Sequence, residues 1–61
     1  MSKDRAYRTI MNWIGCRIDD AMMILDGVWA VRGDNYSAQI VEEDYVEIYR
    51  NGFLIHRIFV F

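Results

Sequence analysis

Asn51-Gly52 is the sequence feature that most constrains the fold, because it lies between two apolar runs, residues 45–50 and 53–60. A two-residue type I′ hairpin turn needs positive φ at both central positions, and Asn and Gly tolerate that conformation best. We therefore predict that these two runs form a β-hairpin closed by Asn51 and Gly52.

This turn also predicts which side chains share a face. Counted outward from the turn, Glu47 is expected opposite His56, and Tyr45 opposite Ile58. The face expected to form the core carries Val46, Ile48, Phe53, Ile55, Phe59 and Phe61, with Arg50 and Arg57 reaching its margins. The other face is expected to carry Tyr45, Glu47, Tyr49, Leu54, His56, Ile58 and Val60. Because the outer face of a solvated sheet is usually polar, we expect something to cover part of this mixed face.

The N-terminal region of the chain predicts helices. In residues 3–14 the apolar side chains, Ile10 and Trp13 among them, recur at helical spacing, and Ser2 is a suitable N-cap. Residues 18–26 predict a second helix that ends at Gly27. One longer helix bent at Gly15 is the alternative that the sequence leaves open.

Strand signals follow the helical region. Residues 28–31 predict a short buried strand, residues 32–35 a turn, and residues 36–42 a second strand, which leads into the hairpin. Helices followed by consecutive hairpin-linked strands are typical of an α+β fold. We predict one small domain, with a helical region at 1–26 and an antiparallel β-meander of three to four strands at 28–61.

The length of 61 residues makes stability the main difficulty for this chain. A domain of this size buries only about 60% of the surface that its unfolded chain exposes. With one cysteine no internal disulfide can help, so a dense core and self-association remain, and the 54% hydrophobic composition fits both. We therefore expect a homodimer. The lone cysteine and the polar N-terminus predict a cytoplasmic protein, and no apolar run reaches the roughly 18 residues of a membrane span.

The residue types do not form a pattern that predicts catalysis or metal binding. One cysteine and one histidine cannot build a closed zinc site within one chain, so no metal and no cofactor is expected. We interpret Glu47 and His56 as a cross-strand polar pair and not as an acid–base pair. Cys16 is expected to be a small packed side chain. We therefore predict that the chain is not an enzyme.

The mixed sheet face predicts a surface that binds a partner, since exposed aromatic and aliphatic side chains are typical of interfaces. The acidic run expected at a hairpin tip adds to it. The predicted partner-binding residues are Tyr45, Glu47, Tyr49, Leu54, His56, Ile58, Glu42, Glu43 and Asp44. The function favoured by this pattern is a small protein–protein interaction module, an inhibitor or accessory protein for which a viral or mobile-element origin is one interpretation.

Two other functions compete with this interpretation. Arg5 and Arg8 on the first helix could contact nucleic acid, although the net charge of −2 predicts no tight binding to duplex DNA at physiological salt. The chain could also be the subunit of an enzyme whose site is completed by a partner chain.

Overall fold

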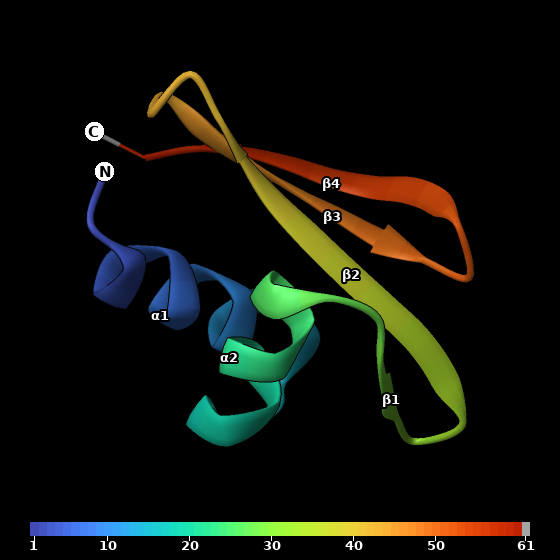
Figure 1. The fold of residues 1–61 in the computed structure, drawn as a ribbon. Helices are drawn as coiled ribbons and strands as arrows, with labels where there is room; N and C mark the ends of the chain where they lie inside the picture. The colour runs from blue at the N-terminus through green and yellow to red at the C-terminus, as the bar shows by residue number, and fades with distance from the viewer. Residues whose placement is uncertain (61) are drawn as a thin grey trace.

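Two helices precede a four-stranded antiparallel sheet in the computed structural model, which describes residues 1–60 (Figure 1). The elements are α1 (Lys3–Ile14), α2 (Ile18–Asp26), β1 (Trp29–Val31), β2 (Asp34–Val41), β3 (Tyr45–Arg50) and β4 (Phe53–Phe59). The strands lie in chain order, so each pairs with its sequence neighbours. The predicted α+β fold, with its N-terminal helices and antiparallel meander, is confirmed.

Gly15 ends α1, so the helical region consists of a pair of separate helices and not of one bent helix. Gly15 has a φ of 72°, and its N–H bonds the carbonyl of Met11 at 2.8 Å. This left-handed cap satisfies a carbonyl in the last turn. At the other end of α1 the Ser2 hydroxyl accepts a hydrogen bond from the N–H of Arg5 at 3.3 Å, as the N-cap prediction required.

Arg32 connects the β1–β2 turn to the end of α1. Its guanidinium donates from Nη2 to the carbonyl of Ile14 at 2.6 Å and from Nη1 to that of Gly15 at 3.0 Å. A cation at this end of a helix also complements the helix dipole. The turn itself is formed by Arg32 and Gly33, both at positive φ. Because the turn is shorter than the predicted 32–35, β2 begins at Asp34 and not at residue 36.

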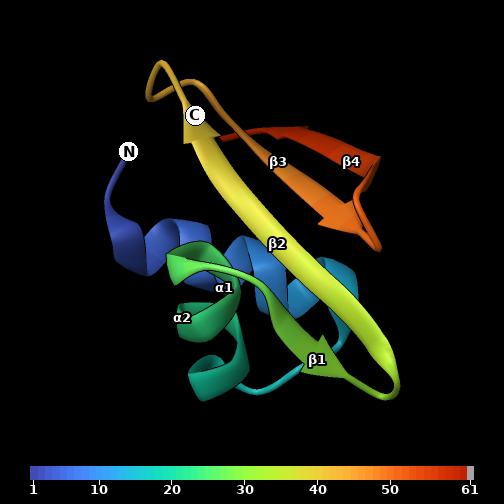
Figure 2. The ribbon, with the colours of Figure 1, turned by 45° about the vertical axis from the view of Figure 1, so that its right-hand side comes forward.

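Both helices pack on one face of the sheet, and the core lies between the two layers (Figure 2). The buried apolar residues are Ala6, Ile10, Ile14, Ala21, Ile24, Val31, Tyr36, Val46 and Ile48. Val46 and Ile48 face the helices as predicted. The short strand β1 is less buried than predicted, since Val31 is buried but Trp29 and Ala30 are exposed.

The Asn51-Gly52 turn has the predicted geometry, with φ values of 51° and 86°. Arg50 pairs with Phe53 and Tyr49 with Leu54, as predicted. Beyond them a β-bulge shifts the register by one residue, because Ile48 pairs with His56 and not with Ile55.

The predicted pairs Glu47–His56 and Tyr45–Ile58 are therefore wrong: Glu47 pairs with Arg57, and Tyr45 pairs with Phe59. A bulge adds one residue to a strand, and every side chain beyond it changes face.

The bulge reverses the predicted faces of β4 beyond Ile55. His56 and Ile58 lie on the helix side, and Arg57 and Phe59 lie on the other side. Phe59 is consequently 56% exposed instead of buried in the core, and Phe53, next to the turn, is 76% exposed. Phe61, which was also assigned to the core, lies outside the described residues.

Candidate functional site

The sheet face opposite the helices is not covered by any element of residues 1–60 (Figures 1 and 2). Side chains from β2, β3 and β4 meet on it because the antiparallel pairing places them side by side. We call this surface the open face; its main residues are Gln39, Tyr45, Glu47, Tyr49, Leu54, Arg57 and Phe59.

A hydrogen-bonded carboxylate stands at the centre of the open face. Glu47 Oε1 accepts from Gln39 Nε2 at 2.9 Å and from the Tyr49 hydroxyl at 3.2 Å. Glu47 Oε2 accepts from Arg57 Nη2 at 3.0 Å and from Arg57 Nε at 3.2 Å. Because these neighbours surround it, Glu47 is only 7% exposed although no helix covers it. Four donors thus hold one carboxylate in a fixed position.

The same contacts determine the ionisation of Glu47. The hydrogen bond from Gln39 is the largest influence that lowers the pKa of the carboxyl below its usual range, while partial burial opposes it. The bonds from Arg57 and Tyr49 lower the pKa further. The Glu47 side chain is therefore a carboxylate at neutral pH. Its negative charge is balanced by the positive charge of Arg57.

Aromatic and aliphatic side chains flank this polar centre. The rings of Tyr45 and Phe59 lie 5.0 Å apart between centroids, and the Arg57 guanidinium lies 5.4 Å from the centroid of Tyr45. Phe59 remains 56% exposed and Leu54 43% exposed. The half-buried ring of Tyr45 and the exposed ring of Phe59, beside an anchored arginine, give this face the composition of a protein interface, where Tyr, Phe and Arg are enriched.

A shallow groove of about 400 Å³ runs beside the polar centre. Its lining comes from β2, from β3 and from the turn that closes the β3–β4 hairpin: Ser37, Ala38, Gln39, Tyr49 and Gly52. The hydroxyl and amide groups that line it can orient a partner's polar atoms next to the aromatic region of the face.

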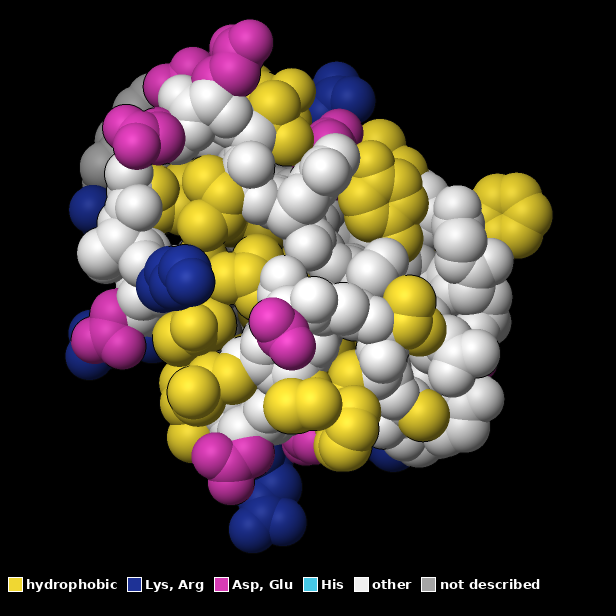
Figure 3. Space-filling view, in the orientation of Figure 1, with side chains coloured by type: hydrophobic (Ala, Val, Ile, Leu, Met, Phe, Trp, Pro, Cys, Tyr) yellow, Lys and Arg dark blue, Asp and Glu magenta, His cyan; other side chains and the backbone are white. Residues whose placement is uncertain are grey.

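The acidic turn, residues Glu42, Glu43 and Asp44, lies at one end of the sheet and not on the open face. It connects β2 to β3, and all three side chains are exposed. In Figure 3 acidic side chains gather at the corresponding end of the molecule. Glu42 and Glu43 have φ values of 52° and 60°, a conformation that residues with a side chain rarely adopt.

The structure brings together four of the nine predicted partner-binding residues and places the other five elsewhere, three of them in the acidic turn. Tyr45, Glu47, Tyr49 and Leu54 share the open face. His56 and Ile58 lie on the helix side, where the His56 ring is 4.7 Å from that of Trp13 on α1. The sequence interpretation missed Gln39, Arg57 and Phe59, the last of which it assigned to the core face. The signal for Arg57 was its predicted place on the core face, where an arginine is unfavourable.

The remaining candidate residues lie apart from the open face. Arg5 and Arg8 are exposed on α1. Cys16 packs against the core, and burial, followed by the nearby Asp20 carboxylate, raises the pKa of its thiol. Within residues 1–60, no three His, Cys, Asp or Glu side chains come together as a metal site would require.

Comparisons with protein-family models, with curated protein sequences and with solved structures gave no match to this chain. Neither helix has the length and apolar character needed to cross a membrane.

Proposed function

We propose that this chain is a small, non-enzymatic module, an inhibitor or accessory protein, that binds another protein through its open face. The observation that carries the proposal is the aromatic pair of the half-buried Tyr45 and the exposed Phe59 beside the Glu47–Arg57 ion pair, on the side of the sheet opposite both helices. Contiguous exposed apolar surface with a polar centre is typical of docking sites.

The rigidity of this face supports the proposal. Gln39, Tyr49 and Arg57 hold the Glu47 carboxylate from three directions, so these side chains lose little freedom when a partner binds. The Arg57 side chain is still 52% exposed and can donate to a partner carbonyl.

We propose further that the open face also holds a second copy of the chain. A two-fold dimer brings the same patch of each copy together, so the patch must complement itself. The Glu47–Arg57 pair leaves the centre of the face without net charge, which favours such a contact. The half-buried Cys16 thiol fits the reducing cytoplasm as the compartment.

Quantitative capture from a lysate of cells that express the chain tests the docking proposal. The bait is the wild type, the open-face variant Leu54→Glu/Phe59→Glu, or the control Ile18→Glu/Met22→Glu. The control makes the same chemical change at two exposed residues of α2, on the other side of the molecule.

A protein captured by the wild type and the control, and depleted at least tenfold with the open-face variant, supports the proposal. Equal capture by all three baits, with circular dichroism showing folded variants, contradicts it. Light scattering at tens of micromolar tests the homodimer: the wild type should give twice the chain mass and the open-face variant the monomer mass. A monomeric wild type contradicts the dimer alone.

A further inference from the structure

The outer edge of β2 is covered along only half of its length. β2 lies between β1 and β3, but β1 has three residues and pairs with residues 34–36 alone. Residues 37–41 therefore pair with β3 on one side and, within residues 1–60, with no strand on the other. In Figure 2 no strand lies beside the C-terminal half of β2 on the side away from β3. We call the outer side of residues 37–41 the vacant edge.

The hydrogen bonds of Asn35 show which main-chain groups face the vacant edge. The Asn35 N–H donates to Asn51 Oδ1 at 2.9 Å, and the Asn35 carbonyl accepts from the N–H of Asn51 at 2.7 Å. Both groups of Asn35 thus point toward the β3–β4 hairpin. In an antiparallel sheet the N–H and C=O of one residue point to the same side, and this side alternates along the strand. Ala38 and Ile40 consequently point their main-chain groups to the vacant edge.

The four main-chain groups of Ala38 and Ile40 have no hydrogen-bond partner in the described part of the chain. Both side chains are half-buried and pack against the core, so the position of the strand is fixed at this point. Unpaired N–H and C=O groups on a fixed strand are a template for a further strand. Natural proteins often protect such an edge with lysine or proline, and residues 37–41 contain neither.

The side chains of β2 indicate what kind of strand fits beside it. Ala38 and Ile40 lie on the helix side of the sheet, since they stand opposite the buried residues Ile48 and Val46. An added strand would meet apolar groups on that side. On the open face it would meet Gln39, whose Nε2 already donates to Glu47 and Tyr49 and whose Oε1 can accept a further hydrogen bond. Apolar residues that alternate with hydroxyl residues match these two sides.

The charge beside the vacant edge favours a basic partner. The acidic turn follows Val41 directly, and its three side chains are exposed. None of these carboxylates forms a salt bridge within residues 1–60. A strand that runs antiparallel to β2, as β1 does, would begin beside this turn. Basic residues at its N-terminal end would therefore be attracted.

We propose that the vacant edge binds an extended segment of a partner protein that runs antiparallel to β2, in line with β1. The segment begins with basic residues beside the acidic turn and continues with alternating hydroxyl and apolar residues. Two of its apolar residues exchange four main-chain hydrogen bonds with Ala38 and Ile40. This proposal goes beyond the open-face function, because the contact is made by main-chain groups at an edge of the sheet and not by side chains on its face.

A second copy of the chain fits the vacant edge less well than a segment of another protein. Two-fold pairing about Gln39 would place Glu42 of the second copy opposite Tyr36. That place is already taken, because Tyr36 pairs with Trp29 of β1. A segment that is extended over only five residues can end before it reaches Trp29.

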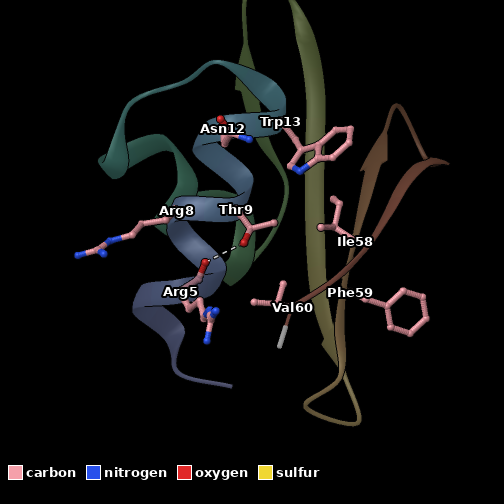
Figure 4. Close-up of a pocket in the computed structure, with 8 residues that line it drawn as sticks. All are labelled: Arg5, Arg8, Thr9, Asn12, Trp13, Ile58, Phe59 and Val60. Carbon is pink, nitrogen blue, oxygen red and sulfur yellow. Dashed lines mark hydrogen bonds between the residues drawn. The ribbon is translucent and has the colours of Figure 1, made fainter.

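A groove between α1 and β4 is the other place where a peptide could lie. It has a volume of about 440 Å³, and Trp13 and Ile58 stand on its two sides (Figure 4). No residue of β2 lines it. A peptide in this groove would cover Trp13, which is 48% exposed, and would leave the amides of Ala38 and Ile40 unchanged. Measurements on these two amides therefore distinguish the sites.

The test uses a fluorescently labelled peptide of two lysines followed by threonine, valine, threonine, valine and threonine. In the proposed complex the valine amides face β2 and the threonine amides face solvent. Fluorescence polarisation compares a peptide N-methylated at both valines with one N-methylated at the two threonines that follow them. Methylated valines should weaken binding at least tenfold, and methylated threonines should leave it within threefold.

The contribution of charge has its own controls. Glutamates in place of the two lysines should weaken binding at least fivefold in about 50 mM salt, where charge contacts are weakly screened. Glu42→Gln should weaken binding of the lysine peptide at least twofold. Asp19→Asn removes the same charge at an exposed position of α2 and should leave binding unchanged.

Residue-resolved amide hydrogen exchange gives the second measurement. In the free chain the amides of Ala38 and Ile40 should exchange faster than that of Gln39, which is bonded to β3. Saturating peptide should slow both at least tenfold. Equal affinity of the two methylated peptides, or unchanged exchange at Ala38 and Ile40, would overturn the proposal. So would a dimer of the free chain in which these two amides are already protected, since a second copy would then occupy the edge.

Discussion

Arg57 Nη2 lies 3.0 Å from Glu47 Oε2, across the β3–β4 pair and on the sheet face that carries no helix. The β-bulge next to Ile48 and Tyr49 produces this contact. Without the bulge, Arg57 would stand opposite Val46 and point toward the helices, where a guanidinium would lose its hydration. One additional residue in β4 therefore keeps the core apolar and places a fixed ion pair among the aromatic residues of the open face.

The first prediction concerns the pH dependence of stability. The pKa of the Glu47 carboxyl is lower in the folded chain than in the unfolded chain, so its contribution is present at neutral pH and is lost as pH falls through the folded pKa. Stability to urea should therefore decrease between about pH 5 and pH 3, the range around and below the ordinary pKa of glutamate. Glu47→Gln should make this decrease smaller. An unchanged pH profile in Glu47→Gln would show that Glu47 does not contribute to it.

The second prediction concerns Gly52, whose φ of 86° is unfavourable for a β-branched residue. Gly52→Val should lower the free energy of unfolding by more than about 1 kcal/mol, measured by urea denaturation. Gly27→Val is the matched control, because Gly27 has an extended φ and no neighbouring atom lies within 4 Å of an added Cβ. The control should change stability by less than half as much. Equal effects would mean that the turn conformation is not the cause.

The third prediction concerns the strained acidic turn. Glu42 and Glu43 occupy the same left-handed region as Asn51 and Gly52, without a glycine to relieve it. Glu43→Gly should raise the free energy of unfolding by about 0.5–1 kcal/mol, the relief of strain less the added entropy of the unfolded chain. Glu43→Ala should give no such gain, because alanine retains the Cβ that causes the strain. A gain with alanine equal to that with glycine would assign the effect to charge instead.

The fourth prediction concerns the contact between Arg32 and the end of α1. Arg32→Met keeps most of the side-chain length but removes the bonds to the carbonyls of Ile14 and Gly15. We expect a loss of about 1–2 kcal/mol in the free energy of unfolding, as for charge-assisted hydrogen bonds. Arg17→Met, at an exposed position, should have a smaller effect. Thermal unfolding followed by circular dichroism measures both losses. Equal losses would contradict a stabilising role for the hydrogen bonds from Arg32 to the end of α1.

The bounds of the helices and the β3–β4 turn could be predicted from the sequence because each depends on local chemistry. Ser2 and Gly15 cap α1, and Gly52 tolerates positive φ, regardless of what the rest of the chain does. The turn at Glu42 and Glu43 has the same type of geometry but carried a weaker signal, since neither residue favours it. At this turn the rest of the fold determines the backbone conformation, although the two residues disfavour it.

The register of β4 could not be predicted, because the strand offers an apolar side chain to the core in either register. Ile55 and Phe59 fit one register, and Ile58 fits the other. What decides between them is non-local: the carboxylate of Glu47 pairs with Arg57, and Trp13 on α1 packs against His56. As a result, the sequence correctly placed Tyr45, Glu47, Tyr49 and Leu54 on one face but assigned His56 and Ile58 to it wrongly.

The central claim is that the open face is where another protein docks, and site-specific photo-crosslinking tests it most directly. A benzoylphenylalanine replaces Tyr45 on the open face or, as control, Met22 on the exposed side of α2, in cells that express the chain. We predict that irradiation produces a discrete adduct with a protein, a second copy included, from position 45 and none from position 22. Adducts from position 22 together with none from position 45 would contradict the claim.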